Sequence, residues 1–82
     1  MQTRTLPADF LKAFQEYAAK SGNKAMALAL DADGRSAFVG VAGYTTQSEA
    51  NEEALSECTR FKPQNGVQEN CRLYAVGDKV VW

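Results

Sequence analysis

Two cysteines, Cys58 and Cys71, are the residues of this sequence best suited to covalent chemistry. A catalytic dithiol favours a C-x-x-C spacing at the start of a helix, where the helix dipole lowers the thiol pKa. Cys58 instead falls near the end of an amphipathic stretch, Cys71 opens an alternating one, and the chain has no histidine to activate either thiol. The pattern favours a structural disulfide between a helix and a strand. Free core thiols, or a zinc or redox role, are the alternatives.

A disulfide in so small a chain is typical of proteins from an oxidising compartment. The first residues, MQTRTLPADF, lack the apolar run of a signal peptide, and no stretch has the roughly eighteen consecutive apolar residues of a transmembrane helix. We therefore expect a periplasmic or secreted protein without a transmembrane segment, and we expect this chain to be a mature or excised piece of a longer precursor.

The run Asp31-x-Asp33-Gly34 resembles the start of a calcium-binding loop. An EF-hand also needs an oxygen ligand at its fifth position and a glutamate at its twelfth. Counted from Asp31, those positions hold Arg35 and Ala42. A tight turn between two strands is the favoured interpretation, and we expect no metal site.

Four glutamates could supply a carboxylate pair for hydrolysis: Glu49, Glu52, Glu53 and Glu57. On a helix, however, their spacing produces a solvated acidic face. Glu57 with Arg60 three residues later is an ordinary ion pair along a helix. The solvated face is the favoured interpretation.

Composition limits the possible functions. The chain has 82 residues, enough for one domain, and its hydrophobic fraction of 45% is ordinary for a folded protein. A net charge of −1 offers no electrostatic footprint for nucleic acid. The absence of histidine removes the commonest general base and the commonest zinc ligand. We expect no cofactor.

The first half of the chain predicts a helix followed by a hairpin. Residues 7–21 carry an apolar stripe at helical spacing, with Lys20 complementing the dipole at the carboxyl end. Residues 24–30 and 36–42 alternate like strands around the glycine-bearing turn. Gly40, inside the second strand, marks a bulge or the close approach of another backbone.

The second half predicts a helix and two more strands. Thr46 and Glu49 fit a capping box, and Pro63 should end the helix. A polar loop over 64–70 leads to strands over 71–76 and 79–82. A right-handed crossover would place the third strand beside the first. The prediction is a single α+β domain over 1–82 with the order α-β-β-α-β-β, a mainly antiparallel sheet of order 2-1-3-4, two packed helices and one disulfide.

Strand alternation also predicts which side chains share a face. If Cys71 faces the second helix, Leu73 and Ala75 should do so too, with Tyr74 on the opposite face. Six side chains on the apolar phase of their elements should be largely buried: Phe14, Met26, Leu28, Leu30, Leu55 and Leu73.

Aromatic residues on the predicted sheet are the candidate partner surface, and they are Phe38, Tyr44, Tyr74 and Trp82. Aromatic side chains with a polar atom are favoured anchors of contact surfaces. The occupant would be an unknown protein or envelope component, or a second copy in a homodimer. The alternative is that the first helix simply covers these residues.

Two segments, ALALDADGRSAFVGVAGYTTQSEANEEALSEC and CRLYAVGDKVVW, resemble a group of small cysteine-paired bacterial α+β domains of unknown function. The likeness covers residues 25–82. These domains occur in exported or envelope-associated proteins, sometimes as an appended module. The resemblance implies the fold and the compartment, and it implies no catalytic residue.

Together these observations predict a noncatalytic, envelope-associated interaction or accessory module, and not an enzyme. The alternative is a small secreted enzyme or inhibitor whose site lies on the loop over 64–70. An ordered polar loop beside a cleft would favour that alternative, and a flat aromatic patch would favour the module.

Overall fold

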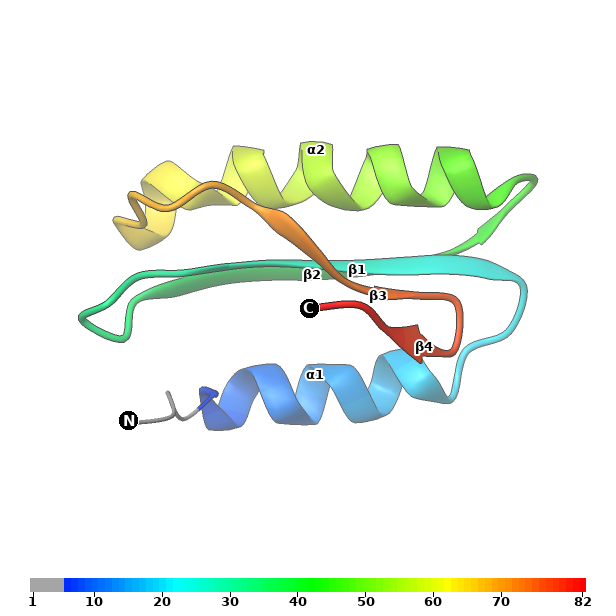
Figure 1. The fold of residues 1–82 in the computed structure, drawn as a ribbon, viewed down its shortest axis with the longest axis horizontal. Coiled ribbons are helices and arrows are strands. Elements are labelled where there is room, and N and C mark those ends of the chain that lie inside the picture. The colour runs from blue at the N-terminus through cyan, green and yellow to red at the C-terminus, as the bar shows by residue number, and fades with distance from the viewer. Residues whose placement is uncertain (1–5) are drawn as a thin grey trace.

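The computed structural model describes residues 6–82 and contains two helices and one four-stranded sheet (Figure 1). The elements in chain order are α1 (Ala8–Ala18), β1 (Asn23–Leu30), β2 (Ser36–Tyr44), α2 (Gln47–Asn65), β3 (Arg72–Val76) and β4 (Lys79–Val80).

The sheet has the order β2-β1-β3-β4, and every neighbouring pair is antiparallel. The connection through α2 therefore carries the chain from β2, past β1, to the far side of β1, as predicted. The helices cover opposite faces of the sheet, α1 on one and α2 on the other (Figure 1). From Lys24 to its end, β1 is buried on both faces. The predicted fold class is confirmed.

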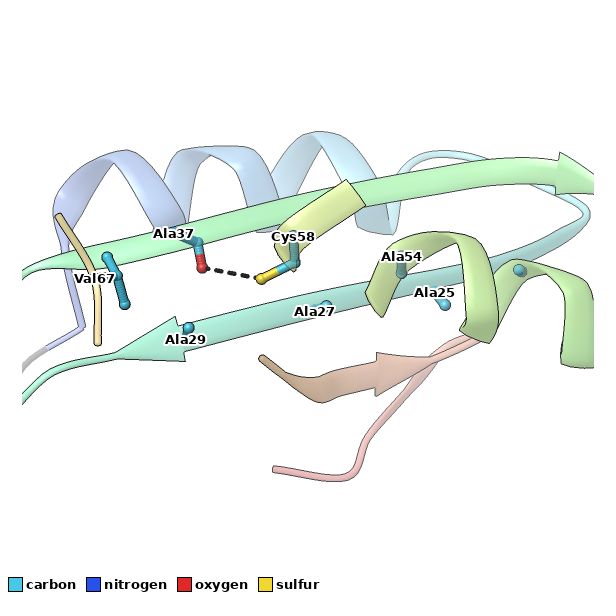
Figure 2. Packing of buried hydrophobic residues seen from close by; sticks show 8 residues of the cluster. Ala25, Ala27, Ala29, Ala37, Ala54, Cys58 and Val67 are labelled. Carbon is cyan, nitrogen blue, oxygen red and sulfur yellow. Dashed lines mark hydrogen bonds between the residues drawn. The ribbon is translucent and has the colours of Figure 1, made fainter. Parts of the chain in front are cut away.

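Side-chain size differs sharply between the two faces of the sheet. The face toward α2 is built on small residues, with this buried cluster: Ala25, Ala27, Ala29, Ala37, Ala50, Ala54, Cys58 and Val67 (Figure 2). The cluster between the sheet and α1 holds larger residues, Phe10 and Tyr17 from the helix and Met26, Leu28 and Leu30 from β1, together with Ala75. Strict alternation of alanine with larger residues along β1 produces this difference, because successive side chains point to opposite faces.

The burial prediction is confirmed for half of its residues. Met26, Leu28 and Leu30 are buried. The other three, Phe14, Leu55 and Leu73, are only half-buried because they pack at the rims of the two clusters.

The hairpin turn forms as predicted. The Gly34 amide donates to the Asp31 carbonyl at 3.0 Å, and the Asp31 amide donates to the Arg35 carbonyl at 2.8 Å. Gly34 has φ +95°, a conformation that favours glycine. The Asp33 carboxylate accepts the Arg35 amide hydrogen at 3.1 Å, so this aspartate stabilises the turn.

The boundaries of the helices differ from the prediction. The capping box of Thr46 and Glu49 is present, but Pro63 lies inside α2 and does not end it. The helix stops two residues beyond Pro63, where Gly66 takes the left-handed conformation with φ 67°. A proline in the last turn removes a single backbone hydrogen bond, which the end of a helix tolerates better than its middle. α1 ends at Ala18, short of the predicted Ser21.

The alternation predicted for β3 is wrong beyond Leu73. In the pairing with β1, Ala27 lies opposite Leu73 and Met26 lies opposite Ala75, so Tyr74 is an extra residue in a β-bulge. Both Tyr74 and Ala75 therefore pack on the α1 side. The expectation that Ala75 faces α2 fails for this reason.

A glycine is needed at position 40 because a side chain, and not another backbone, packs closely against it. A Cβ atom at Gly40 would lie 3.2 Å from Cδ1 of Tyr17, so the absence of a side chain lets the α1 tyrosine approach the strand. The irregularity in the β1–β2 pairing lies elsewhere, between Asn23 and Ala25. Both parts of the prediction for Gly40 are wrong: the pairing is regular at this residue, and the group that approaches it is an aromatic side chain.

Candidate interaction surface

Cys58 and Cys71 form the predicted disulfide, with their Cα atoms 6.1 Å apart. Cys58 is completely buried on the sheet-facing side of α2, and its sulfur lies 3.6 Å from the Ala37 carbonyl oxygen (Figure 2). Cys71 is half-buried just before β3. The bond therefore links the carboxyl-terminal half of α2 to the residue directly before β3.

The loop after α2 is held by a carboxylate. Asp31, directly after β1, accepts hydrogen bonds from the Gln68 amide at 2.9 and 3.1 Å and from the Glu69 amide at 2.8 Å. These two amides hold the pKa of Asp31 below its usual value. The predicted loop over 64–70 is shorter than expected, since α2 runs to Asn65. Its ordered part binds the Asp31 carboxylate through its own backbone.

Of the four aromatic residues predicted as a partner surface, the structure brings three together. The ring of Phe10 meets Phe38 edge-to-face at 5.3 Å and Tyr74 at 4.7 Å. Tyr74 in turn lies 6.0 Å from Trp82. Tyr44 is separate, because it packs against the α2 side of the sheet. The first helix thus covers Phe38 and Tyr74 in part, while Trp82 stays 41% exposed.

Trp82 belongs to a run of exposed apolar residues. Val80, Val81 and Trp82, which we call the C-terminal apolar segment, are 50%, 46% and 41% exposed. The Arg72 guanidinium lies over the Trp82 ring, 4.4 Å from its centroid. Stacking between this cation and the face of an indole is favourable. Arg72 and Tyr74 therefore both contact the exposed Trp82 ring.

Tyr44 lies near a row of carboxylates on α2. Burial raises the pKa of its phenol, and Glu53, Glu57 and Glu49 raise it further. Each of these three glutamates is four residues from the next, so they share one side of the helix. Glu57 also pairs with Arg60 at 3.2 Å, as predicted.

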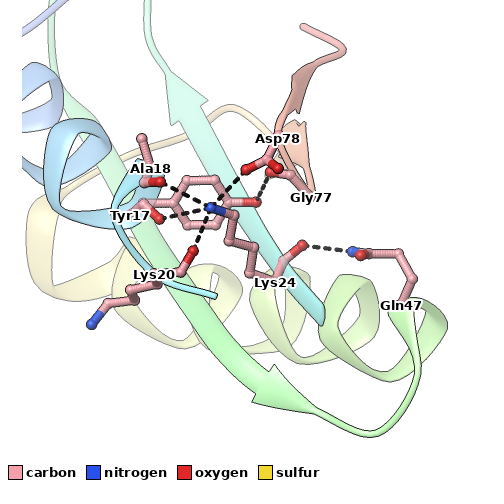
Figure 3. A network of polar contacts seen from close by, with 7 residues as sticks. All are labelled: Tyr17, Ala18, Lys20, Lys24, Gln47, Gly77 and Asp78. Carbon is pink, nitrogen blue, oxygen red and sulfur yellow. Dashed lines mark hydrogen bonds and ion pairs between the residues drawn. The ribbon is translucent and has the colours of Figure 1, made fainter. Parts of the chain in front are cut away.

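The sequence prediction missed Lys24, the most buried charged side chain in the described part of the chain. This side chain is 3% exposed, and its ammonium group donates to the carbonyl oxygens of Tyr17, Ala18 and Lys20 at 3.2, 3.1 and 2.7 Å (Figure 3). Lys24 therefore satisfies the end of α1, the role predicted for Lys20.

The same ammonium group connects α1 to the β3–β4 turn. It lies 2.9 Å from the Asp78 carboxylate and 4.9 Å from the centroid of the Tyr17 ring. The Tyr17 hydroxyl donates to the Gly77 carbonyl at 2.8 Å. The Lys24 carbonyl accepts from the Gly77 amide at 2.9 Å and from the Gln47 side chain at 2.6 Å (Figure 3). Four elements of the chain meet at this lysine.

Lys24 has one signal in the sequence. It shares the strand phase of Met26 and Leu28, which point toward α1, and it follows the predicted end of that helix closely. A lysine on an apolar phase beside a helix end is positioned to cap its carbonyls.

Burial raises the pKa of Tyr17 from 10.0 to about 12, and the Asp78 carboxylate adds to this shift. The folded phenol keeps its proton at a pH where the unfolded phenol has lost it. Its contribution to stability is therefore complete below pH 10 and is lost as the pH rises toward 12. We expect Asp78→Asn to lower the Tyr17 pKa only partly, because burial is the larger cause.

Ultraviolet absorbance of the phenolate measures this pKa, and Tyr17→Phe assigns the signal. An unchanged midpoint in Asp78→Asn would show that Asp78 does not act on Tyr17.

Among residues 6–82, no three cysteine, aspartate or glutamate side chains come together in a way that could hold a metal ion. Within the same residues, no helix is both long enough and apolar enough to cross a bilayer. Comparison with protein-family models, with curated proteins and with solved structures finds no match to this chain. The resemblance to envelope-associated bacterial domains therefore stays a prediction.

Proposed function

We propose that this chain is a noncatalytic interaction or accessory module of the bacterial envelope, and that its contact surface centres on Trp82. The observation that carries the proposal is the C-terminal apolar segment, where three consecutive large side chains remain exposed. Exposed apolar residues grouped in this way mark contact sites more often than single ones do.

The neighbours of Trp82 support a role in binding. Tryptophan, tyrosine and arginine are the residues most enriched among those that dominate binding energy. Trp82 lies against both Tyr74 and Arg72. Because these neighbours already restrict the indole ring, binding would lose little side-chain entropy at this position. The fitting occupant is an apolar patch on a partner protein or other envelope component, with a homodimer as the form in which a second copy fills that role.

The disulfide supports the proposed compartment. A structural disulfide persists in the periplasm or outside the cell, where thiols are not kept reduced. The complete burial of Cys58 fits a structural role. We place the protein in the periplasm or among secreted proteins on this ground and on the resemblance of residues 25–82.

Replacing Trp82 by alanine should abolish partner binding while leaving the fold intact, because the indole is partly exposed and lies at the edge of the α1 cluster. The measurement is affinity capture from an envelope extract of the source organism with immobilised oxidised protein. Leu11→Ala is the matched control, since Leu11 is an equally exposed apolar residue on α1. Sedimentation velocity of the purified chain detects a homodimer in the same set of variants.

The expected result is a defined partner captured by the wild type and by Leu11→Ala but lost in Trp82→Ala. Equal capture by all three proteins would contradict a contact surface at Trp82.

A further inference from the structure

The outer edge of β2 is open over a long strand. The sheet order places β2 at one side, and within residues 6–82 nothing pairs with its outer edge. The strand Ser36–Tyr44 contains no charged residue and no proline. Proteins usually protect such an edge with lysine, proline or a short strand, because open backbone groups are a template for another strand. β2 has none of these three protections, and its pairing with β1 is regular from Ser36 to Val41, with one irregularity before Tyr44.

A row of glutamates on α2, Glu49, Glu53 and Glu57, lies near Tyr44 at the end of this strand. Cys58 faces the sheet from α2, with its sulfur 3.6 Å from the Ala37 carbonyl oxygen of β2, and its bond to Cys71 extends toward β3. Helical spacing puts Glu53 and Glu57 on the flank of α2 away from that bond, the one nearer the outer edge of β2, with Glu49 one turn before them. Their electrostatic effect on Tyr44, at the end of β2, agrees with that position. The edge therefore has apolar strand residues beside it and negative charge above it.

The spacing of the glutamates matches the spacing of an added strand. Residues four apart on a helix are about 6 Å apart along its axis. Residues two apart on a strand are about 6.7 Å apart, and these are the ones that point to one face. α2 runs alongside the β1–β2 hairpin (Figure 1), so the glutamates on α2 and the side chains on one face of an added strand would follow each other at nearly the same spacing.

We propose that the outer edge of β2 binds an extended peptide segment of a partner protein, with lysine or arginine at every second position, by addition of a strand to the sheet. Backbone hydrogen bonds to β2 would supply affinity, and pairing of the basic side chains with the glutamate row would select the sequence and the face. This site is separate from Trp82, so the proposal goes beyond the one made above.

Glu53 should contribute most to this selection. Glu49 already accepts the Thr46 amide and hydroxyl hydrogens, both at 3.1 Å, and Glu57 already pairs with Arg60. In the described part of the chain, the Glu53 carboxylate has no hydrogen-bond donor and no ion-pair partner, and its charge raises the pKa of the Tyr44 phenol. It is thus the carboxylate of the row best placed to gain a new ion pair.

The charge of the row also disfavours a second copy as the occupant. Antiparallel pairing of β2 with β2 of another copy would place both α2 helices on the same face of the joined sheet. The two glutamate rows would then face each other, and like charges at close range oppose association. A basic peptide meets no such repulsion.

The test uses two fluorescent nine-residue peptides with blocked ends, one alternating lysine with valine and the other alternating glutamate with valine. Fluorescence anisotropy with the oxidised chain should show binding of the lysine peptide and none of the glutamate peptide. Glu53→Gln should weaken binding of the lysine peptide about two- to fivefold at low salt, the effect of losing one exposed ion pair. Glu52→Gln is the matched control, because Glu52 is exposed and outside the row.

Amide chemical shifts locate the bound peptide. The proposal predicts the largest shifts over residues 36–44 and unchanged affinity in Trp82→Ala. Equal loss in Glu53→Gln and Glu52→Gln, equal binding of both peptides, or shifts confined to other strands would overturn it. Self-association through β2 would also overturn it, in favour of a second copy. Each of these outcomes leaves the proposed role of Trp82 to its own test.

Discussion

Replacing Lys24 by methionine is expected to lower the free energy of unfolding by about 3 kcal/mol. Methionine keeps most of the apolar volume but removes the donor that serves the carbonyls of Tyr17, Ala18 and Lys20. Carbonyls at a helix end that lose a charged donor, with little water to replace it, incur the full cost of desolvation. Urea denaturation followed by circular dichroism measures the loss.

Asp78→Asn separates the carbonyl contacts from the ion pair. The Asp78 side chain is 91% exposed, whereas that of Lys24 is 3% exposed. An ion pair with one partner in water contributes about 0–1 kcal/mol, so this variant should lose far less than Lys24→Met. Equal losses in the two variants would mean that the ion pair, and not the capping of α1, stabilises this corner of the fold.

Removal of the disulfide by the double change Cys58→Ala and Cys71→Ala is also expected to cost about 3 kcal/mol. The bond joins residues with a sequence separation of 13, and closing this loop restricts the unfolded chain. The cost is large for this protein, because a domain of 82 residues has only about 5–10 kcal/mol of stability in total. Urea denaturation under oxidising conditions measures it.

A reducing agent provides the control for this second prediction. It should destabilise the wild type to near the level of the double variant and leave the double variant unchanged. Two free thiols in the unfolded, unreduced protein would contradict the disulfide itself.

The fold could be predicted from the sequence because its signals are local. Alternation around Gly34 indicates the hairpin, and the capping box at Thr46 indicates the start of α2. The cysteine pair then connects α2 to β3. The hairpin and capping signals each span a few residues, the two cysteines are 13 residues apart, and all three persist when the whole domain packs.

The features that could not be predicted depend on contacts distant in the sequence. The bulge at Tyr74 changes the face of the sheet to which Ala75 points. No residue type in β3 predicts this bulge, because the Tyr74 ring packs against Phe10 and Phe14, which belong to α1. Similarly, the end of α1 depends on Lys24, a residue in the next element.

The candidate sites show the same division. Aromatic type alone indicated Trp82 as a contact residue, but it grouped Tyr44 with residues on the other side of the sheet. The predicted sheet order already put β2 at an edge, but the candidate site there was not predicted, because it depends on the position of Glu53 near that edge.

The alanine-lined face of the sheet has a consequence for how this protein tolerates mutation. Under α2, Ala27 and Ala54 are completely buried, so any larger side chain there must push the helix away from the sheet. Under α1, Phe10 and Leu28 fill the space themselves, and harm comes instead from shortening them. In a deep mutational scan, positions under α2 should therefore reject larger side chains, and positions under α1 should reject smaller ones. Substitutions on the α1 side should be tolerated best when they keep the side-chain volume unchanged.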